Sequence, residues 1–130
     1  MAKQRAGRTG EKYYDPQSKY KHRFQRLVKS QLPTGFKPIE KNKPVIVNCT
    51  FYFIPTKKQQ QTKKFMKKLN SGEEIYYTKK PDRDNLDKWV LDAFNKLVFV
   101  DDNQVCEGRL AKYYSMEPRT EIEIIIPEGV

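Results

Sequence analysis

Four aspartates in the middle of the chain form two pairs whose residue types suit a metal site. Asp82 and Asp84 are two residues apart, and Asp101 and Asp102 are adjacent. If residues 81–85 are extended, alternate side chains leave one face of the chain, so Asp82 and Asp84 can face the same cation. Carboxylates without a thiolate or an imidazole beside them form an all-oxygen site, which suits Mg²⁺ or Mn²⁺ better than zinc. The sequence therefore predicts a magnesium site in which Mn²⁺ can substitute.

Lys88 adds a cation one helical turn beyond Asp84. Apolar residues recur at helical spacing between Leu86 and Leu97, which predicts a helix with one buried stripe and with Lys88 off that stripe. Asp84 or Asn85 is a suitable N-cap for this helix. A lysine at this place can reach a phosphate held over the start of the helix. Beside a metal that activates water, such a lysine favours phosphodiester hydrolysis, an in-line attack that leaves a 5′-phosphate and a 3′-hydroxyl.

How the two aspartate pairs meet is open at this point. A helix over residues 86–97 is about 18 Å long, and the five residues 98–102 reach at most about 17 Å when extended. The second pair therefore either folds back along the helix of its own chain or meets the first pair of another subunit. Each acidic residue alone is explained better as a cap, a turn or a surface charge. Together, in a strongly basic chain, they favour a cation that joins them.

The charge of the chain predicts a polyanionic partner. Its 130 residues carry 26 Lys and Arg against 16 Asp and Glu, a net charge of +10, and this excess favours nucleic acid over a membrane surface. No apolar run approaches the roughly 20 residues of a spanning helix, so we expect a cytoplasmic protein with no membrane partner. His22 is the only histidine, which weighs against histidine-based nuclease sites. Cys49 and Cys106 lack metal-ligand spacing and are expected to be reduced packing residues.

Basic residues gather in three segments that are expected to contact phosphates without reading sequence. A helix that opens at Asp15-Pro16 has a basic face, residues 56–70 form a lysine-rich helix or mobile lid, and two lysines lead into Pro81. The alternative for each segment is an ordinary solvated surface. The residues predicted to bind DNA are Arg23, Arg26, Lys57, Lys58, Lys63, Lys64, Lys67, Lys68, Lys79 and Lys80.

Apolar and polar residues alternate in four stretches that are predicted to be strands. Residues 45–54 have the clearest alternation, and residues 75–78 form a short strand-like run. Residues 105–115 are a strand in which Gly108 indicates a bulge or a close backbone approach. Residues 120–126 alternate again and are expected to pair with that strand as a hairpin.

In chain order these elements predict an α/β fold with a small mixed sheet of three or four strands and helices packed on one face. Residues 1–12 read as a flexible basic arm, and residues 13–130 as a single domain. A sheet this small leaves an edge and a face uncovered. A twofold homodimer would cover them and would place two equal sites on two equivalent strands of a symmetric substrate.

Several of these residues form a pattern that resembles the RusA family of Holliday junction resolvases. The resemblance covers about residues 45–126 and is carried by four motifs: Pro81-Asp82-x-Asp84-Asn85-Leu86-x-Lys88, Leu91-Asp92-Ala93-x-Asn95, Asp101-Asp102-x-Gln104-Val105 and Glu117-Pro118-Arg119-Thr120-Glu121-Ile122.

This resemblance implies a RusA-like homodimeric endonuclease of a bacterial or phage-infected cell. Such an enzyme cuts four-way DNA junctions by paired symmetric nicks in recombination and repair, with Mg²⁺ and without a protein cofactor. By motif position, Asp82, Asp84 and Asp102 would be the catalytic, metal-binding carboxylates and Lys88 the catalytic lysine. Asp101 matches the first of the family's paired aspartates and joins the metal set with a less defined role.

Two other functions remain as alternatives. One is a non-catalytic nucleic-acid-binding module in which the aspartates are only caps and turns, so that Asp84→Asn would leave every activity intact. The other is a metal nuclease of the restriction-enzyme type that acts on duplex or flapped DNA, to which Pro81-Asp82 and Lys88 have a faint likeness. A glutamate-x-lysine partner at a suitable distance is missing, which disfavours this second alternative.

Overall fold

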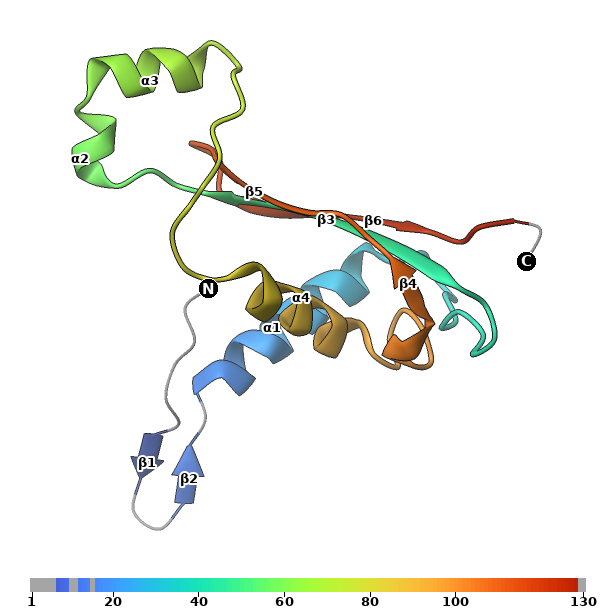
Figure 1. Cartoon of the computed structure of the whole chain (residues 1–130). Helices are drawn as coiled ribbons and strands as arrows, with labels where there is room; N and C mark the ends of the chain where they lie inside the picture. Colours follow the sequence, from blue (N-terminus) through green and yellow to red (C-terminus); the bar gives the residue numbers. More distant parts are fainter. Residues whose placement is uncertain (1–6, 10–11, 15, 129–130) are drawn as a thin grey trace. The chain divides into compact units, whose positions relative to one another are not determined.

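The chain divides into two compact units that interleave in the sequence. The computed structural model describes the backbone of residues 7–9, 12–14 and 16–128 and the side chains from His22 to Glu128. One unit contains the described residues up to Pro44 and residues 80–106, and the other contains residues 45–79 and 107–128. Figure 1 shows the elements of both units. The single domain expected over residues 13–130 therefore stays a prediction.

The first unit is built on two helices, α1 (Pro16–Gln31) and α4 (Arg83–Phe94). Pro16 occupies the first helical position of α1, as predicted. The Phe24 ring of α1 stacks on Trp89 of α4 with 4.1 Å between ring centroids, and Gln25 Nε2 donates a hydrogen bond to the carbonyl oxygen of Ala93 at 3.2 Å. The two helices are thus fixed to each other by an aromatic contact and by a polar contact.

The buried stripe predicted for α4 is confirmed. Leu86, Val90, Ala93 and Phe94 are buried, while the polar positions between them are exposed. The boundaries differ from the expected ones because the extended N-cap residue is Asp82, not Asp84 or Asn85, and the last helical residue is Phe94, not Leu97. An N-cap keeps its carbonyl in the first helical hydrogen bond while its own backbone is extended, and the carbonyl of Asp82 accepts the Leu86 N–H at 3.1 Å.

Strands β1 (Gly7–Thr9) and β2 (Lys12–Tyr14) pair as an antiparallel ladder. These strands are the only described part of the arm expected over residues 1–12, and the rest of that arm lies outside the described residues.

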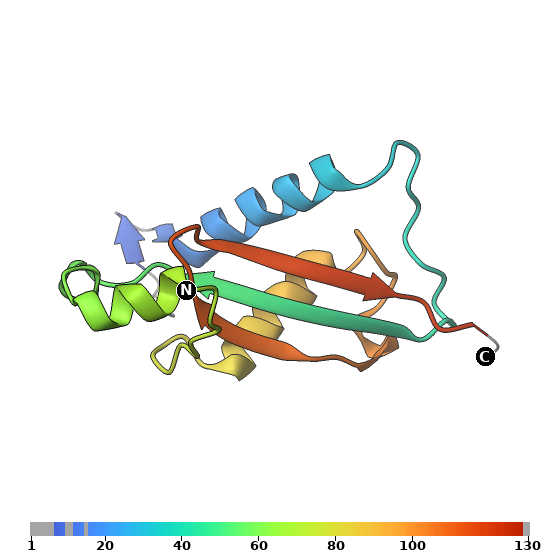
Figure 2. The same ribbon diagram turned by 90° about the horizontal axis from the view of Figure 1, so that it is seen from above.

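The second unit is built on β3 (Val45–Phe53), the strand predicted with the clearest alternation. Along β3, the residues alternate between buried and half-buried from Val45 through Cys49 to Phe51. β5 (Leu110–Tyr114) pairs with β3 in parallel, and β6 (Arg119–Ile125) pairs with β3 in antiparallel orientation. Figure 2 shows β3 between these two neighbours. With β4 (Val105–Glu107), in which the chain passes from one unit to the other, the sheet has four strands and is mixed.

The expected hairpin between residues 105–115 and 120–126 is wrong. Cys49 of β3 faces Leu110 of β5 on one side and Ile122 of β6 on the other, so β3 separates the two strands. Residues 115–118 do not fold β6 back onto β5 but cross the end of β3, where the Ser115 N–H donates to the Phe53 carbonyl at 2.9 Å. A short connection is expected between two strands that pair as a hairpin. It is also long enough to join two strands that lie on either side of a third strand, if the connection crosses the end of that strand.

Gly108 separates β4 from β5, which interrupts the long strand expected over residues 105–115. A Cβ atom at Gly108 would collide with the backbone carbonyl of Val47, so the close backbone approach inferred from the sequence is confirmed. Glycine is required here because no side chain fits between the two backbones.

The lysine-rich segment forms two short helices, α2 (Lys57–Gln60) and α3 (Lys63–Asn70), rather than one. Both contact Tyr114 of β5. Gln59 Nε2 donates to the Tyr114 hydroxyl at 3.1 Å, and the Phe65 ring meets the Tyr114 ring edge-on with 5.3 Å between centroids. Residues 75–78 contribute one bridge, Tyr76 to Tyr113, rather than a strand.

Two expectations drawn from composition can be compared with the structure. Among the described helices, none has the length and apolar character required to cross a membrane. Cys49 is buried in β3 and Cys106 is exposed, and neither of them is in a disulfide bond among the described residues. The packing role expected for both cysteines therefore holds only for Cys49.

Candidate metal-binding active site

The first aspartate pair lies at the N-terminus of α4. Asp82 is the N-cap residue, with an extended backbone and no capping hydrogen bond from its side chain, and Asp84 lies in the first helical turn. Both side chains are exposed. The pair therefore does not form one extended segment, as was assumed from the sequence, but spans the transition from an extended residue to a helix. Carboxylates at this end of a helix are favoured by the helix dipole.

Lys88 and Asp92 follow Asp84 at intervals of four residues along α4, so the three side chains form one row on the helix surface. All three side chains are exposed. Lys88 is thus placed one turn from Asp84, as predicted. Asp92 was not predicted as a site residue, although its position off the apolar stripe was the available signal.

The second aspartate pair belongs to the short 3₁₀ helix η1 (Asp102–Gln104). Asp101 is its N-cap, and an Asp101 carboxylate oxygen accepts the Asn103 N–H at 3.0 Å. One of the alternatives weighed from the sequence, that these residues form a turn, is therefore correct for the backbone. Asp102 is half-buried.

Burial raises the pKa of Asp102 above the ordinary value, and the Asp101 carboxylate, through a hydrogen bond and through its charge, and the charge of Asp92 raise it further. The short helix that contains Asp102 contacts α4, and its interaction with Asp92 assigns Asp102 to the last turns of that helix. The first pair, Asp82 and Asp84, lies at the other end of the same helix. Clustered carboxylates of this kind are unfavourable without a cation.

One copy of the chain does not bring the predicted ligands together. In the part of the chain that the structure describes, no group of three or more aspartate, glutamate, histidine or cysteine side chains is close enough to hold a metal ion. The oxygen donors have the right chemistry for Mg²⁺ or Mn²⁺. Within one copy of the chain, however, an ion would meet only one of the two aspartate pairs at a time. The ligand set of Asp82, Asp84, Asp101 and Asp102 therefore stays a prediction.

Gln104 positions the second pair and was missed as a site residue. It is 5% exposed. Its side-chain oxygen accepts the Asp101 N–H at 2.9 Å, and its Nε2 donates to the carbonyl oxygens of Glu40 at 2.7 Å, Lys43 at 3.0 Å and Ile39 at 3.3 Å. One buried amide thus joins the aspartate turn to residues 39–43. The signal in the sequence was the spacing of Gln104 from Asp101, which fits a capping box.

The residues predicted to bind DNA are described in both units. Lys57 and Lys58 lie on α2, and four lysines lie on α3, all exposed. Among them, Lys68 forms a surface ion pair with Glu73 at 3.9 Å. Lys79, Lys80, Arg23 and Arg26 are also exposed. Their contacts with DNA stay predictions.

Comparison with known proteins identifies the chain as an endodeoxyribonuclease by its family. Residues 1–125 match the family described as Endodeoxyribonuclease RusA. The chain therefore belongs to the RusA family. It is also similar to the uncharacterized protein YqaN of Bacillus subtilis (strain 168), with 37% identity over 116 residues, which cover 85% of this chain and 75% of that protein. No solved structure matches the chain.

We expect Gln104→Leu to lower the free energy of unfolding by about 1–3 kcal/mol, because the Asp101 N–H and the carbonyls of residues 39–43 would lose their buried partner. Urea unfolding of the two proteins measures this change. Asn103→Ala alters the exposed neighbouring side chain and serves as the control, for which we expect almost no change. Equal stability of Gln104→Leu and the wild type would contradict the anchoring role.

We expect Asp102→Asn to stabilise the metal-free protein at neutral pH. The pKa of Asp102 is raised in the folded state, so the stability linked to this group is present below its unfolded pKa and is lost as the pH rises through the folded pKa. The gain should therefore disappear in acid, where the wild-type carboxyl is also neutral. Urea unfolding in the presence of a chelator at pH 7 and below pH about 4 measures the difference. Asp87→Asn removes an exposed charge from the same helix and is the control.

Proposed function

We propose that this protein is a divalent-metal-dependent endonuclease that resolves four-way DNA junctions as a homodimer. The observation that carries the proposal is the exposed row on α4 in which Lys88 follows Asp84 by one turn, with exposed Asp82 at the N-cap. This row occurs in a chain of the RusA endodeoxyribonuclease family. Exposed carboxylates gathered in a chain of net charge +10 would repel a DNA substrate unless a cation lies between them.

The proposed metal ligands are Asp82, Asp84 and Asp102, with Asp101 beside them. A bound Mg²⁺ or Mn²⁺ would supply an activated water and neutralise charge at the scissile phosphate. Lys88 stands one turn from Asp84, where its ammonium group can stabilise the charge that develops on the phosphate oxygens. Asp101 holds the η1 turn through its capping bond, so its first contribution is to position Asp102.

A second copy of the chain would complete each site. Asp102 interacts with Asp92 near the C-terminal end of α4, whereas Asp82 and Asp84 lie at its N-terminal end. In a twofold dimer, one copy can offer its first aspartate pair to the second pair of the other copy, and the symmetry generates two such sites. Two equal sites match the two equivalent strands of a four-way junction, which supports paired nicks.

The first experiment compares cleavage of a synthetic four-way junction with cleavage of a duplex of the same sequence, with and without Mg²⁺. We expect paired nicks in the junction alone, and we expect Asp84→Asn to reduce the rate by roughly 10²-fold or more. Binding of the junction by this variant should persist or tighten because a repulsive charge is removed. Asp87→Asn, on the same helix, is the matched control and should cut normally.

Binding without metal-dependent cutting by the wild type would instead identify a non-catalytic DNA-binding module. Equal cutting of duplex and junction would identify a nuclease without junction selectivity. Either result would contradict the proposed resolvase.

A mixing experiment tests whether the two copies share each site. Asp84→Asn and Asp102→Asn homodimers should each be inactive, but subunit exchange between them should restore one intact site per heterodimer if the pairs come from different copies. We expect each heterodimer to nick one strand of the junction. Since about half of the dimers in an equal, fully exchanged mixture are heterodimers, about a quarter of the wild-type number of sites should be active. A mixture that stays inactive after proven exchange would show that each site takes both pairs from one copy.

A further inference from the structure

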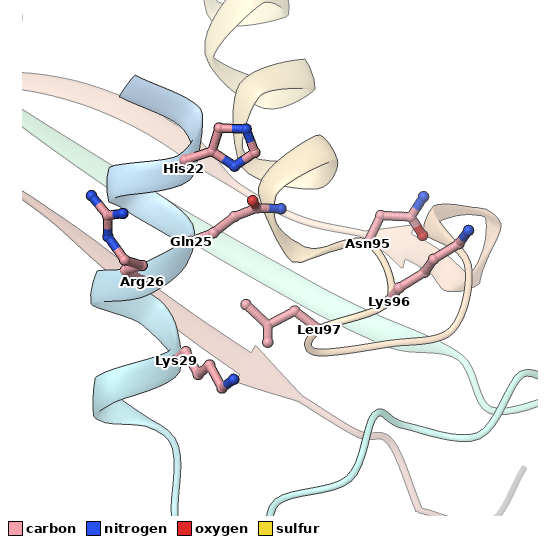
Figure 3. A pocket seen from close by; sticks show the side chains of 7 residues that line it. All are labelled: His22, Gln25, Arg26, Lys29, Asn95, Lys96 and Leu97. Atoms are coloured by element: carbon pink, nitrogen blue, oxygen red, sulfur yellow. The ribbon is translucent and has the colours of Figure 1, made fainter. Parts of the chain in front are cut away.

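A pocket with basic walls lies within the first unit, at the C-terminal end of α4. Its volume is about 350 Å³. One wall is the exposed face of α1, and the other is the loop that follows α4 (Figure 3). The residues that line it are His22, Gln25, Arg26 and Lys29 from α1 and Asn95, Lys96 and Leu97 from the loop.

The α1 wall is fixed by two contacts of that helix with α4. Gln25 donates to the Ala93 carbonyl, and Phe24 stacks against Phe94 with 6.0 Å between ring centroids. His22, Arg26 and Lys29 follow one another at intervals of four and three residues, so they share one face of α1. The basic side chains are therefore carried by a helix that is docked on α4.

The loop wall is fixed by its own backbone. The Lys96 N–H donates to the Phe99 carbonyl at 2.7 Å, and the Phe94 carbonyl accepts the N–H groups of Leu97 at 3.0 Å and Val98 at 2.8 Å. Lys96 has a positive φ of 67°, a conformation that glycine adopts more readily than lysine. The turn thus places a lysine at the edge of the pocket, at a position where the backbone favours glycine.

The charges of the pocket select an anion. Arg26, Lys29 and Lys96 are exposed cations, His22 adds an imidazole, and no carboxylate occurs among the seven lining residues that the structure describes. The carbonyl groups of Ala93 and Phe94, which end α4, accept hydrogen bonds from Gln25 and from the loop. The negative end of the helix dipole is thereby partly covered, so the cations are left to attract an external anion.

We propose that this pocket binds a backbone phosphate of the DNA, with the adjoining sugar against Leu97. Arginine and lysine together are the usual ligands of a phosphodiester, and the volume exceeds that of one phosphate group, which leaves room for the sugar. Asn95 follows Asp92 by three residues, less than one turn of helix, so this phosphate would lie near the proposed cleavage site without being the one that is cut. The inference rests on the proposed function for its substrate.

The test uses two full-length double variants that lose the same charge. Arg26→Gln with Lys96→Gly removes two cations of the pocket, and Lys37→Gln with Lys41→Gln removes two exposed lysines outside it. Binding of a four-way junction is measured without divalent metal over a range of salt concentrations. We expect the pocket variant to reduce the slope of log affinity against log salt by about 1 more than the control. Equal slopes in the two variants would overturn the proposal.

A second measurement separates DNA from a free anion. The His22 imidazole is followed by NMR while inorganic phosphate or a short DNA duplex is added to the wild type. We expect the duplex to shift this signal at concentrations at which inorganic phosphate does not. A shift with inorganic phosphate alone would overturn the assignment to DNA. Lys96→Gly by itself should not lower the melting temperature, since the variant relieves the positive φ, so weaker binding cannot be attributed to unfolding.

The outcome is independent of cleavage because both measurements are made without metal. A slope change in the pocket variant with no metal-dependent cutting by the wild type would sink the proposed nuclease function and keep the pocket. Normal metal-dependent cutting by the wild type, with equal salt slopes in the two variants, would support the nuclease function and overturn the proposed phosphate pocket.

Discussion

The buried amide of Gln104 is the constraint on which the second half of the candidate site depends. Among the described residues, Gln104 is the only polar residue that is buried. Its four hydrogen bonds join the η1 turn to residues 39–43. Water cannot replace these partners at low cost. The backbone of the η1 turn is fixed by the hydrogen bonds of Gln104. Asp102 can therefore lie near Asp101 and Asp92 in spite of the repulsion between the three carboxylates.

Local features of the fold were predictable from the sequence, and long-range pairing was not. The apolar stripe of α4 and the alternation of β3 are periodic signals within one element, and both are confirmed. The position of β6 depends on which strand it pairs with, and its alternation of isoleucines suits β3 as well as β5. The length of residues 115–118 favoured a hairpin, but a chain that crosses the end of one strand needs no more residues.

The same limit applies to the site. The residue types and the row from Asp82 to Lys88 on α4 followed from spacing, as did the affinity of carboxylates for a hard cation. The N-cap was misplaced by two or three residues because Asp82, Asp84 and Asn85 all suit that role, and only the backbone decides among them. Asp92 and the pocket residues Lys96 and Leu97 were missed, since their relation to Asp102 and to α1 arises from tertiary contacts that no local pattern contains.

The central place of β3 also affects how the chain is made. All of its partners, β4, β5 and β6, follow it in the sequence. Between Phe53, the last residue of β3, and Val105, the first of β4, lie 51 residues, which a ribosome adds in roughly 3 to 10 s at ordinary rates. During that time an apolar strand has no native neighbour and can pair with other chains. The lysines of residues 57–68 emerge directly behind this strand, and their mutual repulsion would keep nascent copies apart until the sheet closes.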